Sequence, residues 1–265
     1  MSREKSSMFV EAPDLPPGTL VHKPPRDGVQ WRFDGRRLEG VRFERIKDGP
    51  DWLSFRDCDF VDCEFVDCKL DWYLGSPLPD PGAASRFSRC VFTRCDLRDV
   101  YVRRARFEDC TFDSCRWNAH FFAVDLLRNR FVGTVDSLSL WGREDEPGAP
   151  RNVIIGNDFS QADLLGMGLS AEVPVDDQLW PRDEHHVRVE RVPDRMRALR
   201  TRLEQDGSDP ELLRWLEFYW VDLEPANVQS TKVVRLDDPL MDDTWRRAWR
   251  ALVAVELGGE GDGRP

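Results

Sequence analysis

The chain has 265 residues, of which 40% are hydrophobic and 33% charged, and its formal net charge is −11. That length can bury a substantial core, either as one long domain or as a domain joined to a smaller one. The negative charge argues against a nucleic-acid binder that works through phosphate contacts. No apolar run approaches the roughly 18 residues of a membrane span, and the charged start of the chain lacks the apolar core of a signal peptide. We therefore expect a cytoplasmic protein that contacts neither nucleic acid nor membranes directly.

Residues 1–30 contain five prolines, which predict an extended N-terminal arm. Such an arm can hold Phe9 and Val10 against the structure that follows. The open end of that structure needs a cover of this kind.

A five-residue period begins after the arm and is clearest in "FRDCDFVDCEFVDCKL", residues 55–70. Five residues advance an α-helix by about 140° past a full turn, so the large apolar residues would scatter around it. In a long strand, an odd spacing would send successive large residues to opposite faces. A short strand followed by a two-residue corner fits the spacing. Repeated corners would wind the chain into a coil, with the large residue and a small one inside.

The same pattern returns in residues 85–117 and in "ADLLG", residues 162–166. It resembles the pentapeptide-repeat family, whose consensus is A-(D/N)-L-X-X: ADLLG matches outright, and CDF, CEF, CDL and VDL match with tolerated residues. The resemblance covers about residues 31–169 and implies a right-handed quadrilateral β-helix with four pentapeptides per coil. We expect this mainly β fold over residues 31–170. Like residues that lie 20 apart agree with stacked coils: Phe87/Phe107, Cys90/Cys110, Phe92/Phe112 and Cys95/Cys115.

All seven cysteines occupy the small inward position of a unit. Disulfide frameworks place cysteines at loop junctions, and metal sites need cysteines that point to a common centre. The C-x₄-C spacing of this chain puts neighbouring cysteines on different sides of the coil. We therefore predict reduced thiols that fill the core, with no metal site and no cofactor.

Two segments rich in Pro and Gly interrupt the repeat at residues 71–84 and 135–152, and they predict loops that leave the coil. Long loops in compact folds are often functional, and aromatic anchors often dominate protein interfaces. An alternative is that the aromatic side chains of these loops fold back onto the coil wall. The candidate partner contacts in the two loops are Trp72, Tyr73, Trp141, Glu144, Asp145 and Glu146.

Residues 171–257 lack the repeat and predict a small helical region. Apolar spacing indicates helices over 192–205 and 209–220, the second with Asp209 as a plausible N-cap. The tail that follows, residues 258–265, is expected to be disordered.

A third helix is predicted within residues 238–257, because four large apolar residues share one face of it. So much apolar area on one helix needs a cover. We expect this helix either to cap the last coils or to form a homodimer interface. The four residues are Trp245, Trp249, Leu252 and Val253.

No motif of a nucleotide-binding, hydrolase or metalloprotease site is present in the sequence. His185 and His186 follow acidic residues in a polar linker that supplies no identifiable metal partners. We therefore predict a non-catalytic scaffold that binds an unidentified protein. An enzyme built on the coil is an alternative, which a pocket with convergent titratable groups beside the C-terminal helices would favour.

The resemblance also implies an alternative partner. The best-understood members of the family resemble a DNA duplex, bind DNA gyrase and protect it from poisons, which would make this chain an antibiotic- or self-resistance protein. Such mimicry needs acidic residues stacked along one side of the coil. The pairs that lie 20 apart in the central coils form no acidic stripe: Arg86/Arg106, Arg89/Asp109, Arg94/Ser114 and Asp96/Arg116.

Overall fold

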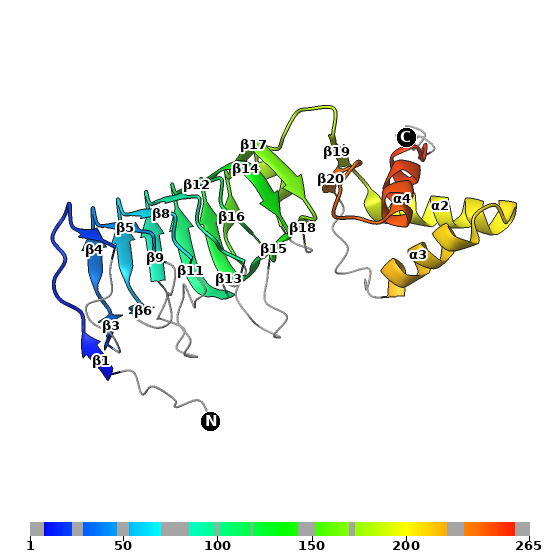
Figure 1. Ribbon diagram of the computed structural model, residues 1–265. Helices are drawn as coiled ribbons and strands as arrows, with labels where there is room; N and C mark the ends of the chain where they lie inside the picture. Colours follow the sequence, from blue (N-terminus) through cyan, green and yellow to red (C-terminus); the bar gives the residue numbers. More distant parts are fainter. Residues whose placement is uncertain are drawn as a thin grey trace, which may run out of the picture.

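A rod of stacked coils makes up most of the molecule, and a group of helices follows it at the C-terminal end (Figure 1). The mainly β fold that the sequence predicts is confirmed. The computed structural model describes residues 8–22, 29–46, 53–69, 85–98, 101–117, 119–142, 152–169, 173–221 and 231–257.

Three parallel sheets run along the rod, and each strand pairs with its counterpart in the next coil. The three-stranded sheet consists of β1 (Met8–Glu11), β3 (Val29–Asp34) and β6 (Leu53–Arg56). The seven-stranded sheet consists of β2 (Leu20–Val21), β5 (Arg42–Glu44), β8 (Glu64–Val66), β10 (Val91–Thr93), β12 (Thr111–Asp113), β14 (Arg130–Asp136) and β17 (Asp158–Leu165). The eight-stranded sheet consists of β4 (Arg37–Glu39), β7 (Asp59–Val61), β9 (Ser85–Ser88), β11 (Tyr101–Glu108), β13 (Ala119–Leu127), β15 (Leu138–Leu140), β16 (Ile154–Ile155) and β18 (Gly168–Leu169).

A fourth side of the coil is marked by single bridges that join Lys69 to Asp96 and Asp96 to Arg116. The N-terminal arm contributes two of the strands, because β1 pairs with β3 and β2 pairs with β5. The chain therefore forms the quadrilateral β-helix that the resemblance to the pentapeptide-repeat family implies.

The register confirms the 20-residue coil where the repeat is regular: Phe87 pairs with Phe107, and Phe92 with Phe112. The step across residues 71–84 is longer, because Phe60 pairs with Phe87, 27 residues further on. Residues 71–84 lie between these two partners, so the insertion leaves the pairing of the flanking coils intact.

The prediction of the second loop is wrong for its first residues. The sequence predicts a loop over 135–152, whereas β14 runs to Asp136 and β15 follows directly. Val135, Leu138 and Leu140 are all buried in the coil core. The prediction failed there because these residues leave the five-residue frame and still point inward.

Stacked phenylalanine rings form the centre of the rod. Phe92 is fully buried and stacks on the rings of both neighbouring coils, with centroids 4.8 Å away in each direction. Offset stacking of this kind adds to the large apolar area that each ring buries. The column ends at Trp180, whose ring lies 5.0 Å from Phe159. Its members are Phe43, Phe65, Phe92, Phe112, Phe131, Phe159 and Trp180.

The cysteines are free and buried, as predicted. Each thiol also donates a weak hydrogen bond to a carbonyl of the preceding coil. Cys110 Sγ lies 3.3 Å from Phe87 O, and Cys115 Sγ lies 3.4 Å from Phe92 O. Burial raises the pKa of the Cys58 thiol to about 11, which keeps it protonated at neutral pH. All seven thiols are structural groups, because a buried thiol is not accessible to a reaction partner.

Buried amides continue one cysteine column toward the C-terminal end. Asn129, Asn157 and Gln178 follow Cys110 and are each at most 5% exposed. Asn129 Nδ2 donates to Asn157 Oδ1 over 2.9 Å, and Asn157 Nδ2 donates to Gln178 Oε1 over 2.9 Å. Asn129 Nδ2 also bonds to Phe107 O at 3.0 Å. The amides thus make the same bond to the preceding coil as the thiols do, and they add bonds to one another.

The helical module, residues 186–221 and 231–257, has its own hydrophobic core. Asp209 accepts a hydrogen bond from Leu212 N at 3.0 Å and so caps its helix as predicted. Arg195 Nη1 donates to three carbonyls at the end of the last helix, the nearest being Val255 O at 2.6 Å. The elements are β19 (His186–Val189), α2 (Val192–Asp206), α3 (Pro210–Val221), β20 (Lys232–Arg235) and α4 (Asp243–Val253). No helix in the described part of the chain is long and apolar enough to cross a membrane.

Candidate functional site

Most of the predicted partner contacts lie outside the described residues. This holds for Trp72, Tyr73, Glu144, Asp145 and Glu146. Trp141 is half-buried, and its carbonyl accepts a hydrogen bond from Asn152 Nδ2 at 2.6 Å. The role of these residues in partner binding stays a prediction.

The last coil is covered by a segment that the sequence did not single out. Val173 and Val175 are buried against the coil core, and Trp180 stacks on Phe159. Trp180 Nε1 donates to Val175 O over 2.7 Å, which fixes the indole in place. A short 3-10 helix, η1 (Val175–Asp177), lies within this segment. Residues 173–180 therefore form the terminal cap of the β-helix.

Helix α4 lies in the helical module and not on the coils, which corrects one of the two expectations for it. Trp249 and Leu252 are buried in the second core, with Trp245 and Val253 packed against the same cluster. The apolar face of α4 packs against the apolar faces of α2 and α3 in this second core. The alternative, a dimer helix, stays a prediction that the mass of the protein in solution tests.

Deleting residues 238–265 should unfold the helical module and leave the β-helix folded. Helix α4 supplies one wall of the second core, whereas the terminal cap covers the last coil without it. Limited proteolysis with mass spectrometry should show cleavage throughout α2 and α3 and a protected core that extends to residue 180. Cleavage within residues 152–169 at the same rate would contradict this assignment of the cap.

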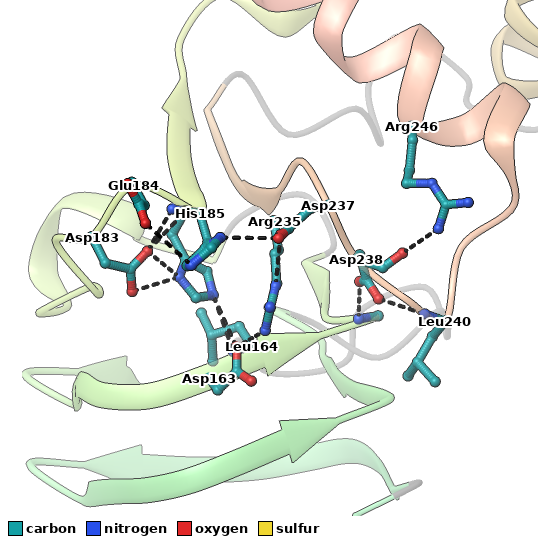
Figure 2. Close-up of polar contacts among 12 residues, drawn as sticks. Asp163, Leu164, Asp183, Glu184, His185, Arg235, Asp237, Asp238, Leu240 and Arg246 are labelled. Atoms are coloured by element: carbon teal, nitrogen blue, oxygen red, sulfur yellow. Dashed lines mark hydrogen bonds and ion pairs between the residues drawn. The ribbon is translucent and has the colours of Figure 1, made fainter.

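A polar junction joins the helical module to the last coil (Figure 2). Arg235 of β20 pairs with Asp163 of β17 and, over 2.8 Å, with Asp237. Asp238 Oδ2 accepts the backbone N–H of Gly166 at 2.6 Å. Next to these bonds, Val233 of β20 is buried in the coil core. The strand pair β19–β20 thus contacts both cores and fixes the module on the rod.

His186 is a buried ionisable group of the junction, with its side chain 2% exposed. Its Nδ1 lies 2.9 Å from Asp183, and its Nε2 accepts the backbone N–H of Leu164 at 3.1 Å. The ring is therefore the neutral tautomer that carries its proton on Nδ1. Burial of the Asp183 carboxylate opposes ionisation, but hydrogen bonds from the His186 ring and from two backbone amides prevail and lower its pKa to about 2.

The junction groups are paired with one another, so the arrangement connects two folded units and presents no open reactive centre. Among the described residues, no group of three or more His, Cys, Asp or Glu is arranged to hold a metal ion. Sequence reasoning missed this site because Asp163 and Arg235 are 72 residues apart. The one available signal was the alternation in "HVRV" (186–189), which indicates a strand but places His186 on the face of the exposed Arg188 and so does not indicate its burial.

The outer corners of the coil carry charges that alternate from one coil to the next. Arg89 forms two hydrogen bonds with Asp62, both 2.7 Å long, and Arg128 forms two with Asp109, at 2.8 and 2.9 Å. The register also confirms that Arg86 stacks on Arg106. Exposed pairs of this kind contribute about 0–1 kcal/mol each. Their main effect is that this corner presents no continuous acidic stripe.

Residues 83–116 match a family model described as pentapeptide repeats, eight copies. Among solved structures, full-length QnrB1, a plasmid-mediated fluoroquinolone resistance protein, is 14% identical, with 61% of this chain and 81% of that chain covered and a TM-score of 0.27. A trypsin-treated form of QnrB1 is 15% identical, with 61% and 78% covered and a TM-score of 0.23. These two likenesses are too weak to bear on function, and no curated protein matches the chain. Residues 83–116 therefore carry the repeats of the pentapeptide family, and five-residue units continue the same coil on both sides of them.

Proposed function

We propose that the protein is a non-catalytic, cytoplasmic scaffold that binds another protein. The observation that carries this proposal is the separation of the two cores. Residues 173–180 cover the end of the rod, and among the described residues of the helical module only Val233 belongs to the buried coil core. A second folded unit, held on a stiff rod by a specific junction, is suited to presenting surfaces at a fixed spacing.

The predicted loop of residues 71–84 and the part of the second predicted loop that follows β15, residues 141–152, are proposed to carry specificity. Their aromatic residues are of the type that most often dominates protein interfaces. The coil walls are less suited to this, because their long charged side chains already pair across coils. On the helical module, Phe218 of α3 is 68% exposed and provides a further aromatic contact.

Protection of DNA gyrase through charge mimicry is the alternative function. The paired corners disfavour it, since Asp62 and Asp109 are each neutralised by an arginine of the next coil. A gyrase complex formed through the loops instead would not depend on an acidic stripe. Binding of gyrase through charge mimicry and binding through the loops can be distinguished, because different variants would abolish the protection of gyrase in the two cases.

The partner test uses the full chain and two variants, one lacking residues 72–83 and one lacking residues 143–151. A partner captured by the intact protein and then purified should bind at least about 10-fold more weakly to one of the variants. The first deletion removes the aromatic anchors Trp72 and Tyr73, and the second removes the acidic residues Glu144, Asp145 and Glu146. Circular dichroism checks that both variants stay folded. Undiminished binding by both would contradict the role of the loops, and a purified partner that is chemically turned over would contradict the scaffold.

Purified gyrase provides the test of the alternative. We expect the intact protein at micromolar concentration neither to bind gyrase nor to change its supercoiling activity in the presence of a fluoroquinolone. Restored supercoiling would establish the alternative. The Asp62→Asn/Asp109→Asn variant would then separate the two routes, because only charge mimicry depends on these carboxylates.

A further inference from the structure

The junction between the β-helix and the helical module depends on the protonation state of one buried side chain. His186 Nε2 can accept the Leu164 N–H only while that nitrogen is unprotonated. Leu164 belongs to β17, the last strand of the seven-stranded sheet, and His186 begins β19 of the module. This single bond therefore joins the two units directly through the ring.

We propose that His186 is a pH-sensitive contact that couples the helical module to the rod when its ring is neutral and releases the edge of β17 when the ring is protonated. Histidine is the side chain whose charge ordinarily changes between pH 5 and 8, which is why it serves as a pH-sensitive contact in proteins. This inference concerns regulation of the scaffold and does not depend on which partner it binds.

Protonation replaces the acceptor on Nε2 with a second donor. The ring N–H and the Leu164 N–H, whose nitrogens lie 3.1 Å apart in the neutral state, would then point at each other. The charge would also arise on a side chain that is 2% exposed, where the charged form is poorly solvated. Both effects push the ring away from Leu164.

The groups that face His186 determine whether another bond can replace the lost one. Asp183, from its own segment, is bound to Nδ1 in both protonation states and gains only Coulomb attraction. Asp163 of β17 has its nearest oxygen 3.9 Å from Nε2 and is already paired with Arg235 of β20. Neither carboxylate can replace the Leu164 bond without movement of the ring. The neighbouring His185 bonds to Asp237 at 2.9 Å on the exposed side and is not part of this contact.

Other bonds hold the module near the rod after this one opens. Asp238 still accepts the Gly166 N–H, and Val233 stays in the coil core. We therefore expect local release of β17 and increased motion of β19, and not detachment of the module.

The test is nitrogen-15 NMR on the full chain between pH 8 and 5, which reads the His186 ring nitrogens and hydrogen exchange at the Leu164 amide. After correction for intrinsic exchange, the protection of Leu164 should fall about 10-fold per unit of pH as the His186 midpoint is approached from above, in step with protonation of Nε2. A ring that stays neutral down to pH 5, or a protonated ring with Leu164 still protected, would overturn the proposal.

Two variants provide matched controls. In His186→Gln the amide oxygen is an acceptor that does not titrate, so the pH dependence of Leu164 protection should disappear. In His185→Gln, which alters the adjacent exposed ring, the wild-type dependence should remain. A pH response that persists in His186→Gln or vanishes in His185→Gln would assign the effect to another group. If His186→Gln does not fold, the wild-type ring titration still decides the question.

Discussion

Replacing Phe112 with alanine should lower the free energy of unfolding by about 3–5 kcal/mol, one of the largest effects of any single substitution in this chain. The side chain is 2% exposed and stacks between Phe92 and Phe131, with centroid distances of 4.8 and 5.1 Å. Neighbouring coils cannot close the resulting cavity, because hydrogen bonds between strands fix their spacing. Truncation therefore costs both the transfer energy of the ring and the cavity term.

Urea denaturation followed by circular dichroism measures this effect. Val91→Ala is the matched control, since Val91 lies on the outer face of β10 and is 37% exposed; its cost should be about 1 kcal/mol or less. A loss below about 1 kcal/mol for Phe112→Ala would mean that the column of rings does not stabilise the coil as described.

Asn157→Leu should cost about 2–5 kcal/mol despite conserving the approximate shape of the side chain. Asn157 is fully buried, and its Oδ1 accepts from Asn129 N at 3.0 Å while its Nδ2 donates to Leu126 O at 2.9 Å. Both of these buried backbone groups lose their side-chain partner in the variant, at about 1–3 kcal/mol each. The gain from a more apolar side chain only partly offsets this loss.

Gln161→Leu is the control for that experiment, because Gln161 makes a single exposed bond to Arg130 at 2.7 Å. Its effect should stay within about 0.5 kcal/mol. If the two variants unfold at the same urea concentration, the buried amides are not needed to hold the last coils together.

The sequence predicts the coil well because its information is local. A five-residue period excludes helices and long strands by itself, and like residues 20 apart, such as Phe92 and Phe112, identify partners in neighbouring coils. The amide column is harder to find. Asn129 and Asn157 are 28 residues apart and Gln178 follows after 21, so irregular spacing hides their common position.

The junction could not be predicted for a different reason. Leu164 and His186 are 22 residues apart, and Asp163 and Arg235 are 72 apart, with no periodicity that relates them. Their contact depends on how the second core sits on the first, which is a property of two folded units and not of any segment. The same holds for α4, whose apolar stripe predicts burial correctly but does not specify which surface covers it.

The uninterrupted pairing of Phe60 with Phe87 across residues 71–84 has a consequence for how such a chain can change. The distance between the two ends of the rod depends on the number of coils, at about 4.8 Å per coil, and not on the number of residues. Sequence can therefore be added or exchanged at that corner while the two ends keep their separation. Segments that leave the coil can therefore diversify freely, whereas gaining or losing one coil would shift everything beyond it by a fixed length.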